Sequence, residues 1–271
     1  MDGFLAVAFP TDCVLCGQEL SSIGLLRVCR ICWDSLQAWQ GPVCVRCGLP
    51  FASEHALDSA VAQCGACREA EPAFDAARSF GLYVGKLRQV ILRAKFGSDE
   101  RLSRHLGRLL APAWQALPQV EDLDSPLLVP VPLHSSRQRE RGFNQSALLA
   151  AGLAGELGRE NGGHGPAILA GCLRRRRATR PQTGLSVAAR RENLRGAFEV
   201  AKPEQVRRRA IVLVDDVMTT GATISACARA LRRAGAACVL GITLARATPQ
   251  FPDLLSSDDD PGVDGHGRDS T

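Results

Sequence analysis

The sequence lacks any long hydrophobic run. No stretch of its 271 residues approaches the roughly 20 apolar residues that a membrane-spanning helix needs. The opening apolar stretch from Phe4 to Phe9 is short, follows the acidic Asp2, and has neither the basic leader nor the small-residue cleavage site of a secretory signal peptide. These absences exclude integral membrane proteins and secreted proteins, so we expect a cytoplasmic chain without membrane insertion.

A strong charge of one sign is also missing, and so is one common phosphate-binding loop. The formal net charge is +5 and the hydrophobic content is 45%, values that are ordinary for a globular protein and exclude a disordered chain. No glycine-rich stretch ends in Gly-Lys-Ser or Gly-Lys-Thr, which excludes a Walker A loop. Arginines gather between Arg137 and Arg141 and between Arg174 and Arg209, and such local basic surface suits anionic ligands.

Cysteine, by contrast, is abundant near the start of the chain. Eight of the eleven cysteines fall in the first 67 residues, as the pairs Cys13/Cys16, Cys29/Cys32, Cys44/Cys47 and Cys64/Cys67. A tight turn at such a pair aims both thiolates at one metal ion, and a second pair 12 to 16 residues later completes a tetrahedral shell. The spacing therefore predicts two zinc sites, with the four pairs joined either in chain order or in an interleaved pattern.

Both zinc sites are predicted to be structural. Four cysteines leave no position open for water, and the metals replace a hydrophobic core that about 70 residues would struggle to build. Gly17 and Gly48 follow the first and third pairs and supply turns that bring backbone N–H groups toward the sulfurs. A disulfide framework is the alternative interpretation, and the expected cytoplasmic location argues against it.

The segment after the cysteines predicts a short strand and two helices. Phe74 to Tyr83 has strand character, whereas Lys86 to Phe96 and Leu102 to Leu117 carry apolar residues at helical spacing. Pro112 is expected to kink or end the second helix. The basic residues of the first helix are interpreted as a solvated face: Lys86, Arg88, Arg93 and Lys95. The whole segment is interpreted as a connector or hood.

A phosphate-binding loop is predicted in the last third of the chain. Ala210 to Val214 has the pattern of a buried strand, Asp215 and Asp216 follow at its end, and a helix continues from Ile224 to Arg233. The residues that open this helix are small: Thr219, Thr220, Gly221, Ala222 and Thr223. Backbone N–H groups of such a loop and the helix dipole converge on one anion, and threonine hydroxyls add further donors.

The two carboxylates beside this loop do not suit a phosphate alone, because they would repel it. They suit a ligand that also carries hydroxyl groups, since carboxylates accept hydrogen bonds from a ribose while its 5′-phosphate occupies the loop. An earlier segment has a related layout, in which Leu127 to Val131 predicts a strand that leads through a basic turn into a helix from Ala147 to Leu157. We therefore predict an α/β domain that binds a phosphorylated ribose.

These motifs carry a family resemblance. Val212 to Thr223 resembles the phosphoribosyl pyrophosphate motif of type I phosphoribosyltransferases, with Ala222 where some members have another small residue. More narrowly, the chain resembles the ComF family in its cysteine pairs, which are similar to a double zinc ribbon, and in three further stretches: Val129 to His134, Arg137 to Gln145, and Gln182 to Ser186 followed by Arg190, Arg191 and Asn193. The resemblance runs from residue 1 to about residue 247 and keeps the order of every motif.

The resemblance implies a fold class and a domain order. The fold is α/β, a type I phosphoribosyltransferase-like parallel sheet flanked by helices and preceded by a small four-cysteine zinc-ribbon module. The expected boundaries are a double zinc ribbon at 1–70, a connector or hood at 71–126, a phosphoribosyltransferase-like core at 127–247 and a disordered acidic tail at 248–271.

The resemblance also implies roles for individual residues. Asp215 and Asp216 hold the ribose hydroxyls and Thr219 to Thr223 hold the 5′-phosphate of phosphoribosyl pyrophosphate, which binds with Mg²⁺. The pyrophosphate is held near Pro132 to Ser136, with these polar candidates: His134, Arg137, Arg139 and Arg141. Arg174 to Ser186 resembles the mobile basic loop that closes over such a site, although a solvated arginine-rich face is the alternative for its arginines.

Three functions remain open on these grounds. The family is associated with natural competence, which implies single-stranded DNA and proteins of the competence machinery as partners. An active phosphoribosyltransferase in nucleotide metabolism, with Asp215 and Asp216 as its catalytic residues, is one alternative, and no separate general base is evident. A ligand sensor without turnover is the other, since a fold alone does not establish an enzyme.

Overall fold

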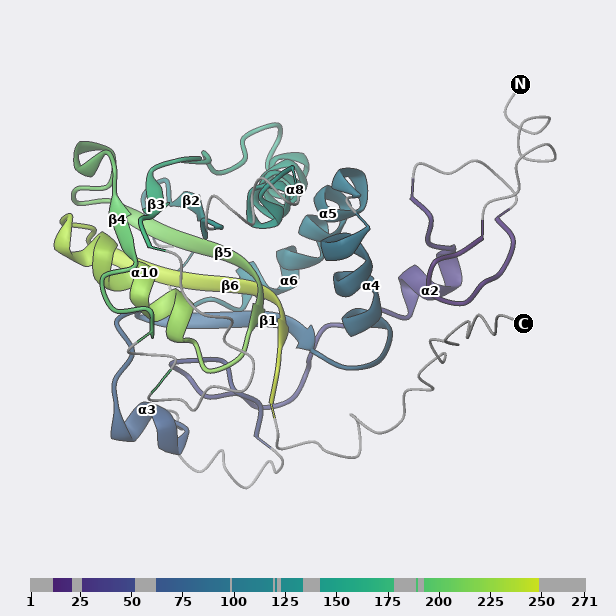
Figure 1. Cartoon of the computed structure of the whole chain (residues 1–271), viewed down its shortest axis with the longest axis horizontal. Helices are drawn as coiled ribbons and strands as arrows, with labels where there is room; N and C mark the ends of the chain where they lie inside the picture. The colour runs from purple at the N-terminus through teal and green to yellow at the C-terminus, as the bar shows by residue number, and fades with distance from the viewer. Residues whose placement is uncertain are drawn as a thin grey trace, which may run out of the picture.

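A four-stranded parallel sheet forms the centre of the molecule (Figure 1). The computed structural model describes residues 12–20, 26–51, 62–97, 99–118, 120, 123–133, 142–177, 189 and 193–248. The strands lie in the order β1 (Ala76–Leu82), β6 (Cys238–Arg246), β5 (Ala210–Met218) and β2 (Leu127–Pro130). Every neighbouring pair runs parallel, with Leu128 beside Val212 and Val214 beside Ile242. The predicted α/β fold with a parallel sheet is confirmed.

Side chains of β5 alternate between two hydrophobic cores, one on each face of the sheet. Val212 and Val214 join the core on one face, and Ile211 and Leu213 join the core on the other. Because both faces are covered, the strand is a continuous apolar run rather than an alternation of apolar and polar residues.

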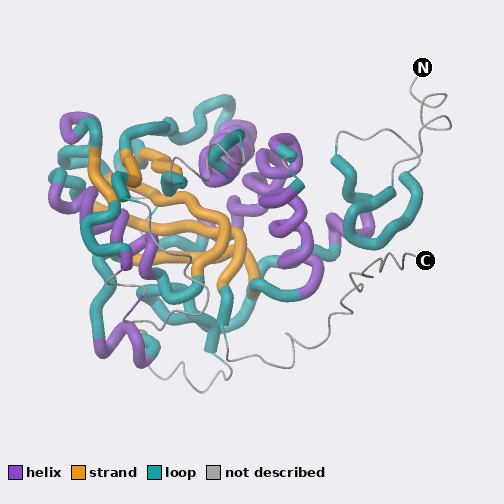
Figure 2. Tube along the Cα trace, viewed as in Figure 1, coloured by secondary structure: helices purple, strands orange, loops and turns teal. Residues whose placement is uncertain are grey.

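Helices from the middle of the chain cover the first face (Figure 2). They are α4 (Gly85–Phe96), α5 (Glu100–Leu106), the 3₁₀ turn η2 (Gly107–Leu110), α6 (Ala111–Gln115) and α8 (Gln145–Glu160). Gly107 and Gly152 let η2 and α8 meet at close range, since a Cβ atom on Gly152 would lie 1.9 Å from the carbonyl oxygen of Arg104. Among the helices in the described ranges, none combines the length and apolar character needed to cross a bilayer.

The opposite face is covered by α10 (Ala222–Arg233) and by a two-stranded antiparallel sheet of β3 (Leu173–Arg175) and β4 (Phe198–Val200). The short turn η3 (Pro203–Gln205) follows β4 and buries none of its residues. The cysteines between residues 44 and 67 belong to this same core, together with the helix α3 (Gly65–Glu69) that carries the last of them. The remaining described helix, α2 (Arg30–Asp34), belongs to the N-terminal cysteine segment and lies beyond α4 in Figure 1.

The structure refines two of the expected elements. The expected strand at Phe74 to Tyr83 is β1, which pairs with β6 and so joins the central sheet. The predicted helix from Leu102 to Leu117 is broken at Gly107 into α5, η2 and α6, and Pro112 lies in the first turn of α6. The expected interruption of this helix is present, but it begins before Pro112, which lies in the first turn of the next helical segment, where a proline sacrifices no hydrogen bond.

Candidate functional site

The predicted phosphate-binding loop connects β5 to α10 at the carboxyl edge of the sheet. β5 continues past Val214 to Met218, because β6 is long enough to pair with it as far as Arg246. Gly221 then adopts a left-handed conformation with φ of 75° immediately before α10 begins at Ala222. This positive φ is a backbone conformation that residues with a Cβ atom rarely adopt, so the turn favours glycine on conformational grounds. The helix thus starts where an anion at the sheet edge would meet its N-terminus.

Asp215 lies half-buried beside this loop. Its Oδ1 accepts hydrogen bonds from the Ser146 hydroxyl at 3.1 Å and from the backbone N–H of Asp216 at 3.0 Å. Burial and the negative charge of Asp216 raise the pKa of Asp215 to about 7, against the opposing effects of the Asp216 N–H, Lys95 and Ser146. Near neutral pH this carboxyl can therefore both accept and donate a hydrogen bond.

Asp216 forms an ion pair with Lys95 of α4, in which Nζ lies 3.0 Å from Oδ1. Both side chains are 16% exposed. The sequence interpretation of Lys95 as part of a solvated face is therefore wrong. One available signal is helical spacing: Lys95 follows the buried Ile91 by four residues and so lies at the edge of the apolar face of α4.

The start of α8 brings the end of β2 to the same place. Asn144 caps this helix: its Oδ1 accepts from the Ser146 N–H at 3.1 Å, and its Nδ2 donates to the carbonyl of Val131 at 3.1 Å. The neighbouring Gln145 is buried, and neither polar atom of its side chain has a partner within the described part of the chain. The carboxyl ends of β2 and β5 and the start of α8 therefore meet at one edge of the sheet, where open α/β folds bind ligands.

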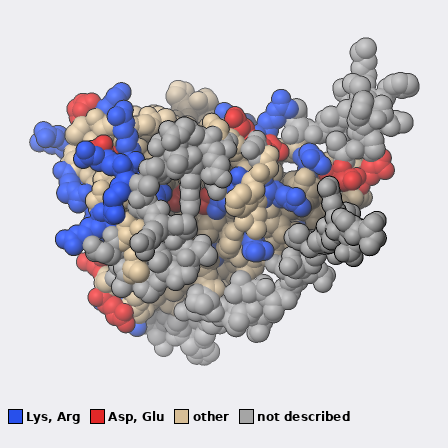
Figure 3. All heavy atoms as spheres, in the orientation of Figure 1, with Lys and Arg blue, Asp and Glu red and all other residues tan. Residues whose placement is uncertain are grey.

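A cavity of about 420 Å³ adjoins the end of β2. Asn144, Pro132 and the basic residues Arg174 and Arg175 contribute to its lining. Arg176 instead pairs with Glu199 at 3.1 Å, and Arg177 donates to the carbonyl oxygens of Asn193 and Arg195. Basic side chains crowd the surface over β3, β4 and α10 in Figure 3. In the arginine-rich segment, Arg174 and Arg175 therefore line a cavity, whereas Arg176 and Arg177 form ion pairs and hydrogen bonds outside it.

Several of the predicted site residues lie outside the described ranges. They are His134, Arg137, Arg139 and Arg141, and the stretches 178–188 and 249–271. The residues that the structure does bring together are Asp215, Asp216 and the loop Thr219 to Thr223, which we call the sugar-phosphate site after the ligand predicted from the sequence.

Arg246 is a site residue that the sequence analysis missed. It ends β6 with only 4% of its surface exposed. One nitrogen, Nη1, donates to the carbonyl of Met218 at 3.2 Å and also to that of Thr219, at the start of the loop. The other, Nη2, lies 3.7 Å from Sγ of Cys47. A single buried guanidinium therefore joins the sugar-phosphate site to a cysteine of the N-terminal segment.

The eight paired cysteines form two groups in chain order. Within each group all four sulfur atoms lie within 4.8 Å of one another, so the sequential assignment holds and the interleaved one does not. The first cysteine group is Cys13, Cys16, Cys29 and Cys32, and the second is Cys44, Cys47, Cys64 and Cys67.

Zinc fits the geometry of both groups. The separations are 3.7 Å between Sγ of Cys16 and Cys29 and 3.6 Å between Sγ of Cys47 and Cys64. They match the edge of a zinc–sulfur tetrahedron, roughly 3.8 Å for a bond of about 2.3 Å, and far exceed a disulfide bond of about 2.05 Å. Backbone N–H groups point at the sulfurs, as those of Cys29 and Cys64 do toward Cys13 and Cys44 at 3.3 Å. Zinc held in this way serves the fold and leaves no open coordination position.

Comparison with known proteins identifies both parts of the chain. Residues 4–69 match the model of the double zinc ribbon domain, and residues 145–252 match that of the phosphoribosyl transferase domain. Competence protein F of Haemophilus influenzae is 33% identical over 243 residues, which cover 88% of this chain and 98% of that protein.

Two further relatives align over most of their length. The DNA utilization protein YhgH of Escherichia coli K12 is 32% identical, over 85% of this chain and 94% of that protein. Competence protein ComFC of Bacillus subtilis is 28% identical, over 87% of this chain and 95% of that protein.

Proposed function

This chain belongs to the ComF family, and on that premise we propose that it binds phosphoribosyl pyrophosphate with Mg²⁺ and acts in the cytoplasm in the uptake or use of single-stranded DNA. The observation that carries the ligand is the pairing of two carboxylates, Asp215 and Asp216, with a glycine-turned loop at the start of α10. The carboxylates accept hydrogen bonds from ribose hydroxyls, while the loop takes the 5′-phosphate.

The surrounding residues prepare the two carboxylates for this task. Ser146 orients Asp215, and Lys95 holds Asp216 through an ion pair that also limits repulsion of the incoming phosphates. Mg²⁺, when bound, neutralises pyrophosphate oxygens, and carboxylate and phosphate oxygens are the donors that it prefers. Arg174 and Arg175, in the cavity at the end of β2, supply positive charge where we place the pyrophosphate.

The proposed association with DNA rests on relatives that align with this chain over nearly their whole length. Their names, competence protein and DNA utilization protein, support single-stranded DNA and proteins of the competence machinery as partners. A reducing compartment such as the cytoplasm suits the free thiolates that two zinc sites need.

Phosphoribosyl transfer is a second candidate function, and one observation favours it. The pKa of Asp215, raised to about 7, matches the working pH of a proton-transfer group, so this carboxyl could take a proton from an acceptor as it attacks the ribose. Asp216 would then stabilise positive charge that develops on the ring.

Calorimetry with phosphoribosyl pyrophosphate and Mg²⁺ tests the binding proposal. We expect heat of binding with the wild-type protein and none with Asp215→Asn/Asp216→Asn, whereas Asp34→Asn, which changes an exposed carboxylate on α2, binds normally. Normal binding by the double variant would overturn the assignment. Release of pyrophosphate in the presence of a panel of bases would establish the enzyme, and binding without release across that panel favours a sensor.

A further inference from the structure

Basic side chains form a stripe along one face of α5 and η2. Arg101, Arg104, His105 and Arg108 stand at spacings of three, four and seven residues, which places them on the same side of a helix. The stripe extends over about 10 Å at a rise of about 1.5 Å per residue. No hydrophobic residue interrupts it, because Leu102 and Leu106 face the core.

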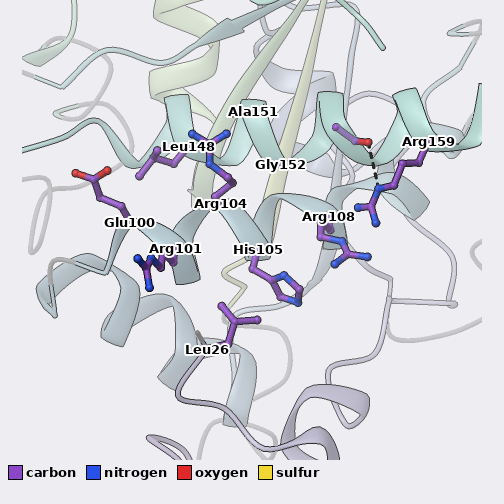
Figure 4. A pocket seen from close by; sticks show the side chains of 11 residues that line it. Leu26, Glu100, Arg101, Arg104, His105, Arg108, Leu148, Ala151, Gly152 and Arg159 are labelled. Carbon is purple, nitrogen blue, oxygen red and sulfur yellow. Dashed lines mark hydrogen bonds between the residues drawn. The ribbon is translucent and has the colours of Figure 1, made fainter. Parts of the chain in front are cut away.

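This stripe forms one wall of a groove of about 570 Å³. In Figure 4, α8 runs along one side of the stripe and Leu26 of the N-terminal segment lies on the other. Gly152 and Gly155 have no side chains to fill the groove beside α8, and Arg159 adds a further guanidinium near the end of this helix. We call this feature the arginine groove, which is lined by Leu26, Glu100, Arg101, Arg104, His105, Arg108, Leu148, Ala151, Gly152, Gly155 and Arg159.

The arginine groove is positive even when its carboxylates are counted. Glu156 pairs with Arg108 at 2.7 Å and also with Arg159, and Glu100 lies at the other end. Arg101 and Arg104 form no ion pair with any residue in the described ranges. Burial, Arg108 and Arg159 lower the pKa of His105, and Glu156 only partly opposes them. The downward shift that Arg108 and Arg159 impose on the pKa of His105, together with Arg101 and Arg104, which lack an ion pair among the described residues, indicates a positive site that attracts anions.

The shape of the groove selects among anionic ligands. It follows α8 from Leu148 to Arg159, a distance of roughly 16 Å at a rise of about 1.5 Å per residue, which exceeds the size of one phosphate. The ring of His105 packs on Trp33 with centroids 4.3 Å apart, so aromatic surface accompanies the arginines. Charge along a line, combined with aromatic rings, is how proteins bind single-stranded nucleic acid.

We infer that the arginine groove binds the phosphate backbone of a single-stranded nucleic acid. This inference rests on the DNA association proposed above and assigns it to a surface that is separate from the sugar-phosphate site. Arg101 and Arg104 contact consecutive phosphates, while Arg108 and Arg159, already held by Glu156, line the continuation of the path. The N-terminal cysteine segment contributes Leu26 to the lining of the groove, and its Trp33 packs against the ring of His105.

A salt titration with a fluorescein-labelled oligothymidylate tests the inference. We expect Arg101→Glu/Arg104→Glu to weaken binding and to reduce the slope of log affinity against log salt by about 1.4, which corresponds to two phosphate contacts on a single strand at about 0.7 each. The matched control is Arg88→Glu/Arg93→Glu, which makes the same charge change on exposed residues of the neighbouring α4. Equal losses in both variants would overturn the inference, because they would reflect net charge alone.

Further measurements separate the alternatives. Arg101→Gln/Arg104→Gln provides a milder variant, and retained binding of phosphoribosyl pyrophosphate shows that either variant is folded. Competition by a mononucleotide as strong as that by the oligomer, or equal affinity for a duplex, would overturn the assignment to a single strand. If wild-type protein binds the oligomer through these arginines but gives no heat with phosphoribosyl pyrophosphate, the proposed sugar-phosphate site fails and the arginine groove stands.

Discussion

The two cysteine groups have the same ligands but different places in the molecule. All four cysteines of the second group are buried and share a hydrophobic core with Phe74, Met218 and Ile224. In the first group Cys16 is exposed and Cys29 is only half-buried. The second group is therefore part of the sheet domain, whereas the first is an attachment to its helical side.

Backbone contacts make the attachment of the second group especially tight. The N–H of Ala77 in β1 donates to the carbonyl of Arg46 at 2.8 Å, and a Cβ atom on Gly48 would lie 2.6 Å from the carbonyl oxygen of Ala77. Arg78 donates to the carbonyl of Val45 at 3.1 Å. The turn between Cys44 and Cys47 thus covers the edge of the sheet and protects β1 from pairing with another chain.

Charge explains why Arg246 can be buried between this group and the phosphate loop. Four thiolates around one Zn²⁺ leave a negative centre, and a buried guanidinium needs such a counter-charge. The same cysteines act on Arg78, whose pKa is lowered by burial, an effect that Cys44 and Cys47 only partly oppose. The second group is therefore expected to support the sugar-phosphate site through Arg246, and the first group is expected to support the arginine groove instead.

The largest expected effect comes from removing one group at a time. Cys44→Ser/Cys47→Ser should abolish the cooperative melting transition, because zinc binding contributes on the order of 10 kcal/mol in small zinc-dependent folds and this site lies in the main core. Cys16→Ser/Cys29→Ser should leave the sheet domain folded and binding phosphoribosyl pyrophosphate. Circular dichroism melts and measurements of zinc content test this difference between the variants. We expect the zinc content of Cys16→Ser/Cys29→Ser to fall from two ions to one. Equal damage by both variants would remove the distinction between the groups.

A smaller effect is expected from the link itself. Arg246→Gln removes the counter-charge of the second group and the donor to the loop, and loss of one partner in a buried ion pair typically costs about 3–5 kcal/mol. We expect a lower melting temperature, an affinity for phosphoribosyl pyrophosphate reduced by about tenfold or more, and two zinc ions retained. Arg246→Lys keeps the positive charge but not the planar guanidinium, so its melting temperature and affinity should lie between those of the wild type and Arg246→Gln. An unchanged affinity in Arg246→Gln would show that the loop holds its shape without Arg246.

The pH dependence of stability sharpens the comparison further. Folding raises the pKa of Asp215 from 3.8 to about 7, so the folded state favours the protonated form. This contribution is complete below about pH 4 and is lost as the pH rises toward about 7. Asp215→Asn does not titrate and stays neutral at every pH, like the protonated carboxyl, so we expect the variant and the wild type to melt alike near pH 4 and the variant to melt higher above pH 7.

The pH dependence of melting also tests whether the first cysteine group is independent of Asp215. The first group contacts α5 through Trp33 and His105, whereas Ser146, Asp216 and Lys95 act on Asp215, so the pH profile should persist in the background of Cys16→Ser/Cys29→Ser. A pH-independent difference between Asp215→Asn and the wild type would contradict the raised pKa.

The parts of the fold and site that could be predicted from the sequence are those encoded locally. Cysteine spacing predicts two four-cysteine groups, although only the structure shows that the pairs join in chain order. The run from Ala210 to Thr223 combines strand, acidic pair, glycine turn and helix within one continuous segment. Lys95 and Arg246 are distant from that segment, and their roles arise only when α4 and β6 pack beside β5. The place of β1 at the edge of the sheet likewise depends on pairing with a strand more than 150 residues later.

The smallest expected effect concerns the contact that joins the first group to the helices. Trp33→Leu removes the ring contact with His105, and aromatic pairs of this kind contribute about 0.5–1.5 kcal/mol beyond the area that they bury. We expect a melting temperature lower by a few degrees, normal binding of phosphoribosyl pyrophosphate and weaker binding of the oligothymidylate. A loss of phosphoribosyl pyrophosphate binding would mean that the first group also supports the sugar-phosphate site.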